Sequence, residues 1–559
     1  MLARVTPLVV EFFRDSPLRH TTFRLFYFGT VGVALGYTMQ ATVAAWLMAT
    51  LTPSALMVAL VQTASTVPFL LFGLAAGTLA DIIDRRRIVI ITQYVLLLTT
   101  VVLGVVTLFG AINPIGLLAL TFVIGSAFTF YTPAQQTSIN DLVARNELPR
   151  AVALGAVAFN VSRALGPALA GLIAALFTTG TAFIISAPFF VVMIIAARRW
   201  KRTPPTPGIP ETLFSGIQTG LRYTRHSPPL RALIIRNVSF GICASGLWAL
   251  LPVIARDQLK LGAGGFGLLS AAFGLGAVIG ALSIPNQLQR RSLNRVVNAG
   301  FALFAVSMIL IAVTDYTIFA LIGAFGAGGA WVSAFASLSA GTQSTAPAWV
   351  RARAVSMSMV AVQASLAAGS VIWGSVAAAA GTHVALGVSA GVMLVLLVLS
   401  RRVRVKLGDE ADVTPFGQMP DLAMTAEPKP DDGPVLIQLE YRIEDASRDD
   451  FLRAIYAIES IRRRNGVSDW HIFRDLGEHG RYVERFVVQS WAEYVRSRTR
   501  MTITDRRIQE RVEKFQREGV EIRVSRLIAI NPEDIDGPPP PPPPAPTPAT
   551  KARVPASAD

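Results

Sequence analysis

Long apolar runs dominate this sequence and constrain its fold more than any other feature. A membrane-spanning helix needs about 20 consecutive, mostly apolar residues, and runs of that length recur from Leu25 to Ser400. We predict twelve spans, at residues 25–51, 55–80, 88–111, 114–137, 151–177, 180–197, 232–255, 265–287, 296–313, 316–341, 352–379 and 382–400. Helices that are apolar over such a length need lipid around them. The sequence therefore predicts an all-α, multi-pass membrane protein embedded in the bilayer.

The composition excludes an ordinary soluble enzyme. Hydrophobic residues make up 52% of the 559 residues and charged residues only 16%, whereas a globular chain is about 25% charged. The net charge is +15, and residues 1–400 hold 25 Lys and Arg against nine Asp and Glu. These basic residues are spread over many loops and form no single patch, so we expect no nucleic-acid partner. Residues 401–559 have a net charge close to zero. This change in composition divides the chain near residue 400.

The basic residues alternate with the predicted spans. Every second loop is basic, and the cytoplasmic loops of membrane proteins are rich in Lys and Arg. The basic loops include residues 85–87, 145–150, 198–225, 290–295 and 351–353. This asymmetry predicts an even number of spans with both termini in the cytoplasm.

The two halves of the apolar part repeat one another at an offset of 203 residues. Five glycine pairs and one arginine pair coincide: Gly73 with Gly276, Gly77 with Gly280, Gly125 with Gly328, Gly166 with Gly369, Gly171 with Gly374, and Arg150 with Arg353. Internal repeats of this kind are typical of transporters. We therefore predict two six-helix halves, residues 1–197 and 231–400, joined by a cytoplasmic linker at 198–230. Asp81, Arg85 and Arg163 have apolar counterparts in the second half, so polar specialisation is concentrated in the first half.

Two segments resemble signatures of a known transporter family. Residues 77–87 read GTLADIIDRRR and resemble the loop signature of the major facilitator superfamily. Residues 163–171 read RALGPALAG and resemble its exporter signature. With twelve spans and an added C-terminal domain, the chain is most similar to the enterobactin-exporter-like group, the transmembrane secretion effectors. The resemblance implies the major facilitator fold, a substrate cavity between the halves, alternating access, and export from the cytoplasm.

The first signature is a candidate gating loop, with Gly77, Asp81, Asp84, Arg85 and Arg86 as its residues. A carboxylate at a helix end, followed by arginines, can interact with helix termini and with opposite charges on neighbouring segments. Contacts that exist in only one orientation of the halves would make this loop a latch. The alternative is a charged turn that only sets the topology.

The second signature places a charge inside the fifth span. Arg163 lies about 18 Å along the helix from Ala151, at ~1.5 Å per residue. A charge near mid-membrane costs at least ~2.5–3.5 kcal/mol, so Arg163 should face a cavity or a partner. It is either a substrate ligand or a tether between helices. Gly166 and Pro167 weaken the helix and Gly171 admits a close neighbour, so this segment is a hinge, a tight packing contact, or both.

Gln40, Asn160 and Gln363 are further candidates for the substrate cavity. Each is polar within an apolar run, and the alternative for each is a plain hydrogen bond between helices. The nine carboxylates of residues 1–400 all fall away from mid-span, whereas exporters of cationic drugs commonly use buried acids. We therefore expect a neutral or anionic, oxygen-rich substrate. The sequence contains no G-x-x-x-x-G-K-[ST] phosphate loop, so we do not expect ATP to drive transport.

Beyond residue 400 the pattern is that of a soluble domain. We expect a linker at 401–433, a ferredoxin-like α+β domain at 434–530, and a proline-rich disordered tail at 531–559. The second helix of this domain is predicted to run unbroken over residues 492–518. The domain resembles small antibiotic-biosynthesis-monooxygenase-type domains, which often pair as dimers.

An enzyme hypothesis for this domain depends on Trp470, His471 and Trp491, because a histidine beside aromatic residues can serve acid-base or haem chemistry. No metal-ligand spacing accompanies His471, so we expect no metal, no cofactor and no catalytic residue. Dimerisation, regulation or docking of a partner are the favoured roles.

These observations together predict a secondary active exporter in the cytoplasmic (inner) membrane of a bacterium. The expected substrate is a small molecule, namely a siderophore or a related neutral or anionic secondary metabolite. Multidrug or macrolide efflux is the alternative within transport. A membrane-tethered enzyme or sensor that acts through its C-terminal domain is the alternative outside it.

Overall fold

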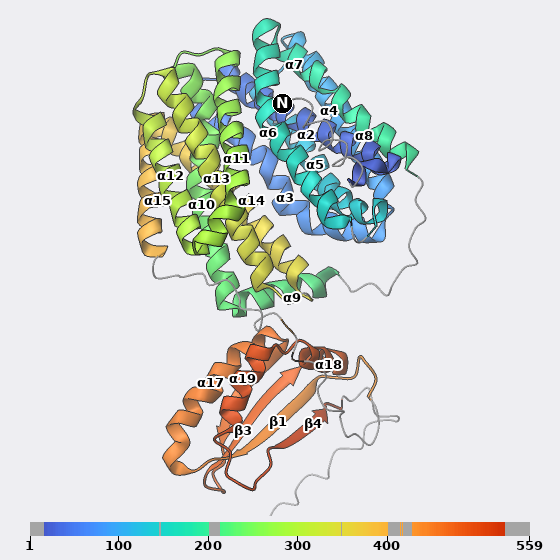
Figure 1. The fold of residues 1–559 in the computed structure, drawn as a ribbon, viewed down its shortest axis with the longest axis vertical. Helices are drawn as coiled ribbons and strands as arrows, with labels where there is room; N and C mark the ends of the chain where they lie inside the picture. The colour runs from blue at the N-terminus through green and yellow to red at the C-terminus, as the bar shows by residue number, and fades with distance from the viewer. Residues whose placement is uncertain are drawn as a thin grey trace, which may run out of the picture.

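The computed structural model describes residues 16–144, 147–200, 213–347, 349–400, 414, 416 and 428–530. The predicted tail at 531–559 and most of the predicted linker at 401–433 lie outside these residues. A helical bundle forms one part of the molecule, and a smaller domain with a sheet lies next to α9 (Figure 1).

The prediction of twelve spans is confirmed, because the described residues contain twelve helical segments that are long and apolar enough to cross a membrane. They are α2 (Thr21–Leu51), α3 (Ala55–Ile82), α4 (Arg85–Leu108), α5 (Pro114–Leu142), α6 (Leu148–Leu176), α7 (Thr179–Ser186) with α8 (Pro188–Arg199), α10 (Pro228–Val253), α11 (Ala263–Arg290), α12 (Leu293–Val313), α13 (Thr317–Thr345), α14 (Arg351–Ala380) and α15 (Thr382–Leu399). The sixth span is divided at Ala187, because Pro188 has no N–H to continue the helical ladder of α7.

The helix ends follow local capping rules. The Ser54 hydroxyl accepts from the backbone N–H of Met57 at the start of α3, and the Asn113 side chain accepts from Gly116 at the start of α5. Pro114 then occupies the first position of α5, where no hydrogen bond is lost. Short loops between capped helices place consecutive spans antiparallel, so the loops fall alternately on two sides of the bundle.

One side of the bundle, which we call the α9 side, carries the ends of the helices at residues 83–84, 143–147, 291–292 and 346–350. The helix α9 (Leu213–His226) lies there, within the segment that joins the halves. The predicted linker at 198–230 did not include this helix. The opposite side, which we call the far side, carries the loops at residues 52–54, 177–178, 259–262 and 381.

The two halves meet through α3 with α14 and through α6 with α11. A Cβ added at Gly171 on α6 would lie 2.6 Å from the Gly267 Cα on α11, and one at Gly374 on α14 would lie 2.5 Å from the Ala59 Cβ on α3. These glycines all lie toward the far-side ends of their helices. Arg256 also donates to the Thr52 carbonyl across the halves on that side, at 2.9 Å. The halves are therefore closed against each other on the far side.

The C-terminal domain contains β1 (Val435–Arg442), α17 (Arg448–Arg464), β2 (Val467–Arg474), β3 (Arg481–Val488), α18 (Trp491–Thr499), α19 (Ile503–Glu513) and β4 (Arg523–Ile528). Its sheet is antiparallel in the order β2-β3-β1-β4. Alternate residues of β1, from Val435 to Tyr441, are buried in a core with Phe451 and Ile455 of α17.

The prediction of one helix over residues 492–518 is wrong, because the chain forms two helices there. Thr502 caps α19 by accepting from the Asp505 N–H, while the Asp505 carboxylate accepts from the Thr502 N–H. This reciprocal cap satisfies the free N–H groups of a new helix start. Hydrophobic periodicity continues across the break and does not reveal it.

Candidate transport site

A small cavity lies between the halves, and it is the first candidate for the place where a substrate binds. It has a volume of about 40 Å³ and is bordered by α2, α3, α5 and α10. Its lining residues are Tyr37, Gln40, Ala41, Ala45, Val58, Val61, Gln62, Ser65, Thr121, Ile124, Trp248 and Ala249. A water needs about 10–15 Å³ of such volume, so this conformation accommodates only a few waters.

The cavity lining carries polar groups that lack partners. Gln40 Nε2, Thr121 Oγ1 and Trp248 Nε1 form no hydrogen bond with any group that the structure describes. Gln40 and Thr121 are only 1% and 3% exposed. Buried polar groups are nearly always hydrogen-bonded, and leaving one unpaired is costly. All three groups can donate, so the cavity wall suits a ligand that presents acceptors.

Arg163 on α6 adjoins this wall. Its guanidinium lies 5.4 Å from the centroid of the Phe159 ring and 6.0 Å from that of the Trp248 ring. Within the described part of the chain it has no carboxylate partner. A cation stacked on aromatic faces keeps its charge available. Arg163 is therefore placed where it can attract an anionic group, and it also links α6 to α10 across the halves.

The other predicted cavity residues lie outside the cavity lining. Asn160 on α6 and Gln363 on α14 are both partly exposed, and neither borders the cavity. Three lining residues, Tyr37, Thr121 and Trp248, were not predicted from the sequence. The sequence does hold a clue to the lining of the first two spans. The lining residues of α2 and of α3 recur at helical spacing, so those of each helix share one face.

The exporter signature provides two close helix contacts. Gly166 lies against the Thr38 side chain of α2, within the first half, and an added Cβ would collide with Thr38 Oγ1. Gly171 lies against Gly267 of the second half. Pro167 is buried inside α6. These placements agree with the packing alternative, and the hinge remains a prediction.

The predicted gating loop ties the first half together on the α9 side. The Asp84 carboxylate caps α4 by accepting from the Arg86 N–H at 3.1 Å. Arg85 donates to the Ala80 and Thr137 carbonyls and pairs with Asp141 at 3.4 Å.

Arg86 extends these contacts to α8, where it donates to the Ala197 and Arg198 carbonyls, both at 2.8 Å. Gly77 has open space around it, and Asp81 lies in the last turn of α3. The latch between the halves stays a prediction, because these contacts all lie within the first half.

A further ionic cluster on the α9 side was not predicted. The Glu147 carboxylate, just before α6, accepts from Arg19 at 2.7 Å and contacts the His20 ring at 3.0 Å. Burial alone raises the pKa of Glu147, but the hydrogen bond from His20 and the charge of Arg19 outweigh it and lower the pKa overall. This cluster ties the segment before α2 to the start of α6.

The candidate catalytic residues of the C-terminal domain do not form one site. The Trp470 indole N–H points inward and donates to the buried Glu484 carboxylate at 2.9 Å. His471 points to the opposite face, is exposed, and lies 3.3 Å from Asp469. Trp491 is buried against Tyr494. The described residues include no group of three His, Cys, Asp or Glu side chains that could hold a metal ion.

Twelve spanning helices in two halves, with a polar-lined cavity between them, define a membrane transporter of the major facilitator type. The sequence profile of the transmembrane secretion effector family matches residues 14–534, and the chain belongs to that family. The fold agrees with solved transporters: the nucleoside transporter NupG aligns with a TM-score of 0.57 at 14% identity, over 68% of this chain and 99% of NupG.

Relatives with assigned substrates fall into two groups. The staphyloferrin A transporter of Staphylococcus aureus is 24% identical over 47% of this chain and 67% of its own length. The enterobactin exporter EntS of Shigella flexneri is 25% identical over 38% of this chain and 49% of its own length. The multidrug efflux pump Tap of Mycolicibacterium fortuitum is 26% identical over 63% of this chain and 88% of its own length. Siderophore and drug transporters are thus about equally similar to this chain.

Proposed function

We propose that this protein exports a siderophore, or a related neutral or anionic secondary metabolite, from the bacterial cytoplasm by alternating access. The observation that carries the proposal is the chemistry of the cavity wall. Gln40, Thr121 and Trp248 offer unpaired donors, and Arg163 adds a positive charge with no carboxylate partner among the described residues. An oxygen-rich molecule with carboxylate, carbonyl or phenolate acceptors would satisfy all four groups.

We further propose the orientation in which the α9 side is cytoplasmic, since the basic loops gather there. The gating loop then lies at the cytoplasmic entrance, and the closed far side faces outward. The element order of residues 434–530 and the sheet order β2-β3-β1-β4 support a ferredoxin-like domain in the cytoplasm. That domain is also a candidate for dimerisation.

Efflux of drugs or macrolides is the second candidate, and one feature favours it. Trp248 belongs to a cluster of aromatic rings on the second half that includes Phe273, Trp331 and Phe240. The other three rings are buried in the core and support Trp248, whose ring borders the cavity and can bind a bulky apolar molecule by burial. A membrane-tethered enzyme or sensor is the candidate from another class, and the separation of Trp470 from His471 weighs against the enzyme.

Deletion of the gene separates these candidates. Secreted and retained metabolites are compared by mass spectrometry in the deletion strain and its parent, under iron limitation and iron repletion. The proposal predicts a siderophore-class metabolite that accumulates inside the deletion strain and falls in its medium under iron limitation. Unchanged siderophore secretion together with greater sensitivity to macrolides or other drugs would favour the second candidate.

A further inference from the structure

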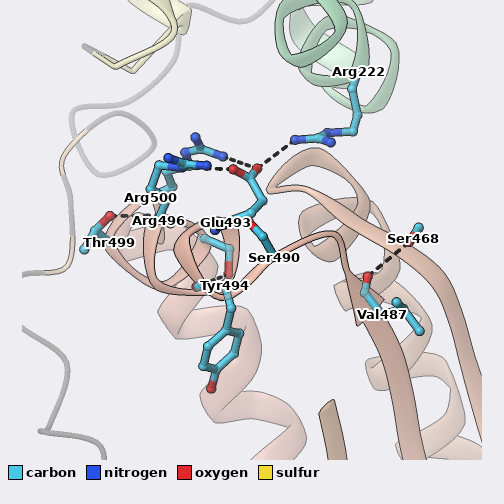
Figure 2. Close-up of polar contacts among 10 residues, drawn as sticks. Arg222, Ser468, Val487, Ser490, Glu493, Tyr494, Arg496, Thr499 and Arg500 are labelled. Atoms are coloured by element: carbon cyan, nitrogen blue, oxygen red, sulfur yellow. Dashed lines mark hydrogen bonds and ion pairs between the residues drawn. The ribbon is translucent and has the colours of Figure 1, made fainter. Parts of the chain in front are cut away.

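The C-terminal domain contacts the membrane part through one carboxylate with three arginine partners. Glu493 on α18 accepts from Arg500 at 2.7 Å, from Arg496 at 3.0 Å, and from Arg222 at 3.0 Å (Figure 2). Arg496 and Arg500 belong to the C-terminal domain, whereas Arg222 belongs to α9. Glu493 is only 8% exposed. This largely desolvated pair, Arg222 with Glu493, therefore links α9 to the C-terminal domain.

A stack of cations and aromatic rings runs beside this carboxylate. The Arg500 guanidinium lies 4.3 Å from the centroid of the Trp349 ring, which meets the Tyr223 ring edge-on at 5.3 Å. Arg464 covers the Tyr223 ring at 5.4 Å. Tyr223 belongs to α9 and Trp349 to the α13–α14 loop, while both arginines belong to the C-terminal domain. Two arginines of the C-terminal domain thus enclose two rings of the membrane part, which adds cation–π attraction to the ion pair.

The backbone of the C-terminal domain is shaped to this contact at Gly466. Its φ of +112° lies in the region that favours glycine. A Cβ there would lie 2.5 Å from Glu493 Oε1 and 3.0 Å from Arg222 Nη2. Any larger residue at this position would push apart the two groups that form the ion pair.

The docked C-terminal domain holds α9 near the start of α14. In alternating access, the two halves have to approach each other on this side of the bundle. α9 also packs against α14, where Gly220 lies against the Arg353 side chain. The halves are closed on the far side, so alternating access requires the first half to swing toward the start of α14 on the α9 side. In the docked state α9 and the α13–α14 loop are held together at that end by the C-terminal domain.

We propose that the C-terminal domain is a regulatory restraint on the transport cycle. Docked through Glu493 and the cation–aromatic stack, it holds α9 against α14 and favours the conformation in which the halves are apart on the α9 side. Closure of the α9 side then requires this contact to loosen. The proposal goes beyond export and does not depend on the identity of the substrate.

Arg222→Ala tests the restraint, with Arg225→Ala as its matched control. Both remove an arginine from α9, but Arg225 is exposed and forms no ion pair with the described residues of the C-terminal domain. Glu493 keeps Arg496 and Arg500 in the Arg222→Ala variant, so the C-terminal domain stays folded. Exchange of the α9 amide hydrogens, measured by mass spectrometry on the full-length protein in nanodiscs, reports docking. We expect faster exchange in Arg222→Ala only.

Spin labels report the conformation in the same nanodiscs. The labels occupy cysteines at Arg87 and Arg290, exposed positions at the α9-side ends of α4 and α11, in a background with Cys243 replaced by Ala. Pulsed electron paramagnetic resonance should show the short-distance, closed population rising about tenfold in Arg222→Ala over Arg225→Ala, the scale of a typical coupling between sites. Equal distance distributions in the two variants would overturn the proposal, as would α9 exchange that Arg222→Ala leaves unchanged.

Glu493→Gln makes the same test from the other side of the contact. Its control is Glu478→Gln, which removes a carboxylate paired with Arg442 at the opposite end of β3. Amide exchange in β1 verifies that the C-terminal domain is folded in both variants. Glu493→Gln should raise the closed population as Arg222→Ala does. An equal rise in Glu478→Gln would mean that any loosening of the C-terminal domain has this effect, and it would overturn the role of the Arg222–Glu493 pair.

Discussion

Arg163 of the first half lies over the indole of Trp248 of the second half, with 6.0 Å between the guanidinium carbon and the ring centroid. The contact joins the one mid-span arginine of the exporter signature to a ring that borders the cavity. Under the proposed function, a substrate in the cavity would contact the Trp248 ring and lie next to the Arg163 charge. The same pair has to separate or slide whenever the halves rock.

Arg163→Ala should reduce export of the metabolite identified by the gene deletion by at least about tenfold, because an anion loses its charged partner in a site shielded from water. Arg198→Ala is the matched control, since Arg198 also stacks on a ring, that of Tyr94 at 5.6 Å, but away from the cavity. Export is measured in cells with equal amounts of each variant in the membrane. Normal export by Arg163→Ala would leave Arg163 with a tethering role alone.

Thr121→Val should preserve or raise stability while export falls. The change keeps the shape of the side chain and removes a buried hydroxyl without a described partner, whose cost is about 1–3 kcal/mol. Thr92→Val is the control, because the Thr92 hydroxyl donates to the Ile88 carbonyl at 2.9 Å and its loss should be neutral or destabilising, with export retained. Thermal unfolding in detergent and cellular export provide the two readouts. A clear loss of stability in Thr121→Val would mean that its hydroxyl is already bonded.

Gly171→Leu should prevent closure of the far side. Even a Cβ at Gly171 would lie 2.6 Å from the Gly267 Cα, so a larger side chain cannot fit between α6 and α11 in the closed arrangement. Gly387→Leu on α15 is the control, because a Cβ added at Gly387 would meet no other part of the protein within 4 Å. Spin labels at Ile115 and Tyr316, both exposed near the far-side ends, should move apart in Gly171→Leu and stay unchanged in Gly387→Leu.

Docking of the C-terminal domain should weaken in acid. Burial raises the pKa of Glu493, but the charges and hydrogen bonds of Arg500, Arg496 and Arg222 outweigh it and lower the pKa below the ordinary glutamate value. Arg500 and Arg496 stay beside Glu493 when the domain undocks, so the attraction that undocking removes is the charge of Arg222. That attraction contributes its full stabilisation while the Glu493 carboxylate is ionised in both states. That stabilisation is lost as the pH falls through the docked value.

Exchange of the α9 amides, corrected for intrinsic rates, should therefore increase below about pH 4.3 in the wild type. The same acid-dependent increase should be smaller in Arg222→Ala, which is already loosened at neutral pH. An α9 exchange rate that is independent of pH in the wild type would contradict this role for Glu493.

Local patterns in the sequence predicted the spans because hydropathy is a property of short segments. The break of the sixth span at Pro188 was not predicted, although it follows from the missing N–H of that residue. The helix α9 was missed because it is short, amphipathic and flanked by proline-rich sequence, which is also typical of a linker. The start of α19 after Thr502 was missed because it interrupts no apolar pattern. Its cap depends on a hydrogen-bonded partner, Asp505.

The candidate site was less accessible to sequence reasoning, because it depends on which faces of distant helices meet. Gln40 was expected in the cavity and borders it, whereas Gln363 was expected and does not. Thr121 and Trp248 resemble ordinary residues of apolar helices until α5 and α10 bring them beside α2. The Arg222–Glu493 pair joins residues 271 positions apart, and no local pattern connects them.

The chemistry of the cavity wall has a consequence for the energy balance of the cell. A transporter that opens alternately to both sides exposes its cavity to the proton and sodium gradients at every turnover. A fixed guanidinium beside the cavity repels small cations. If the protein works as proposed, the Arg163 charge beside Trp248 would disfavour the entry of inorganic cations into the cavity, so that cycling without cargo need not short-circuit the membrane.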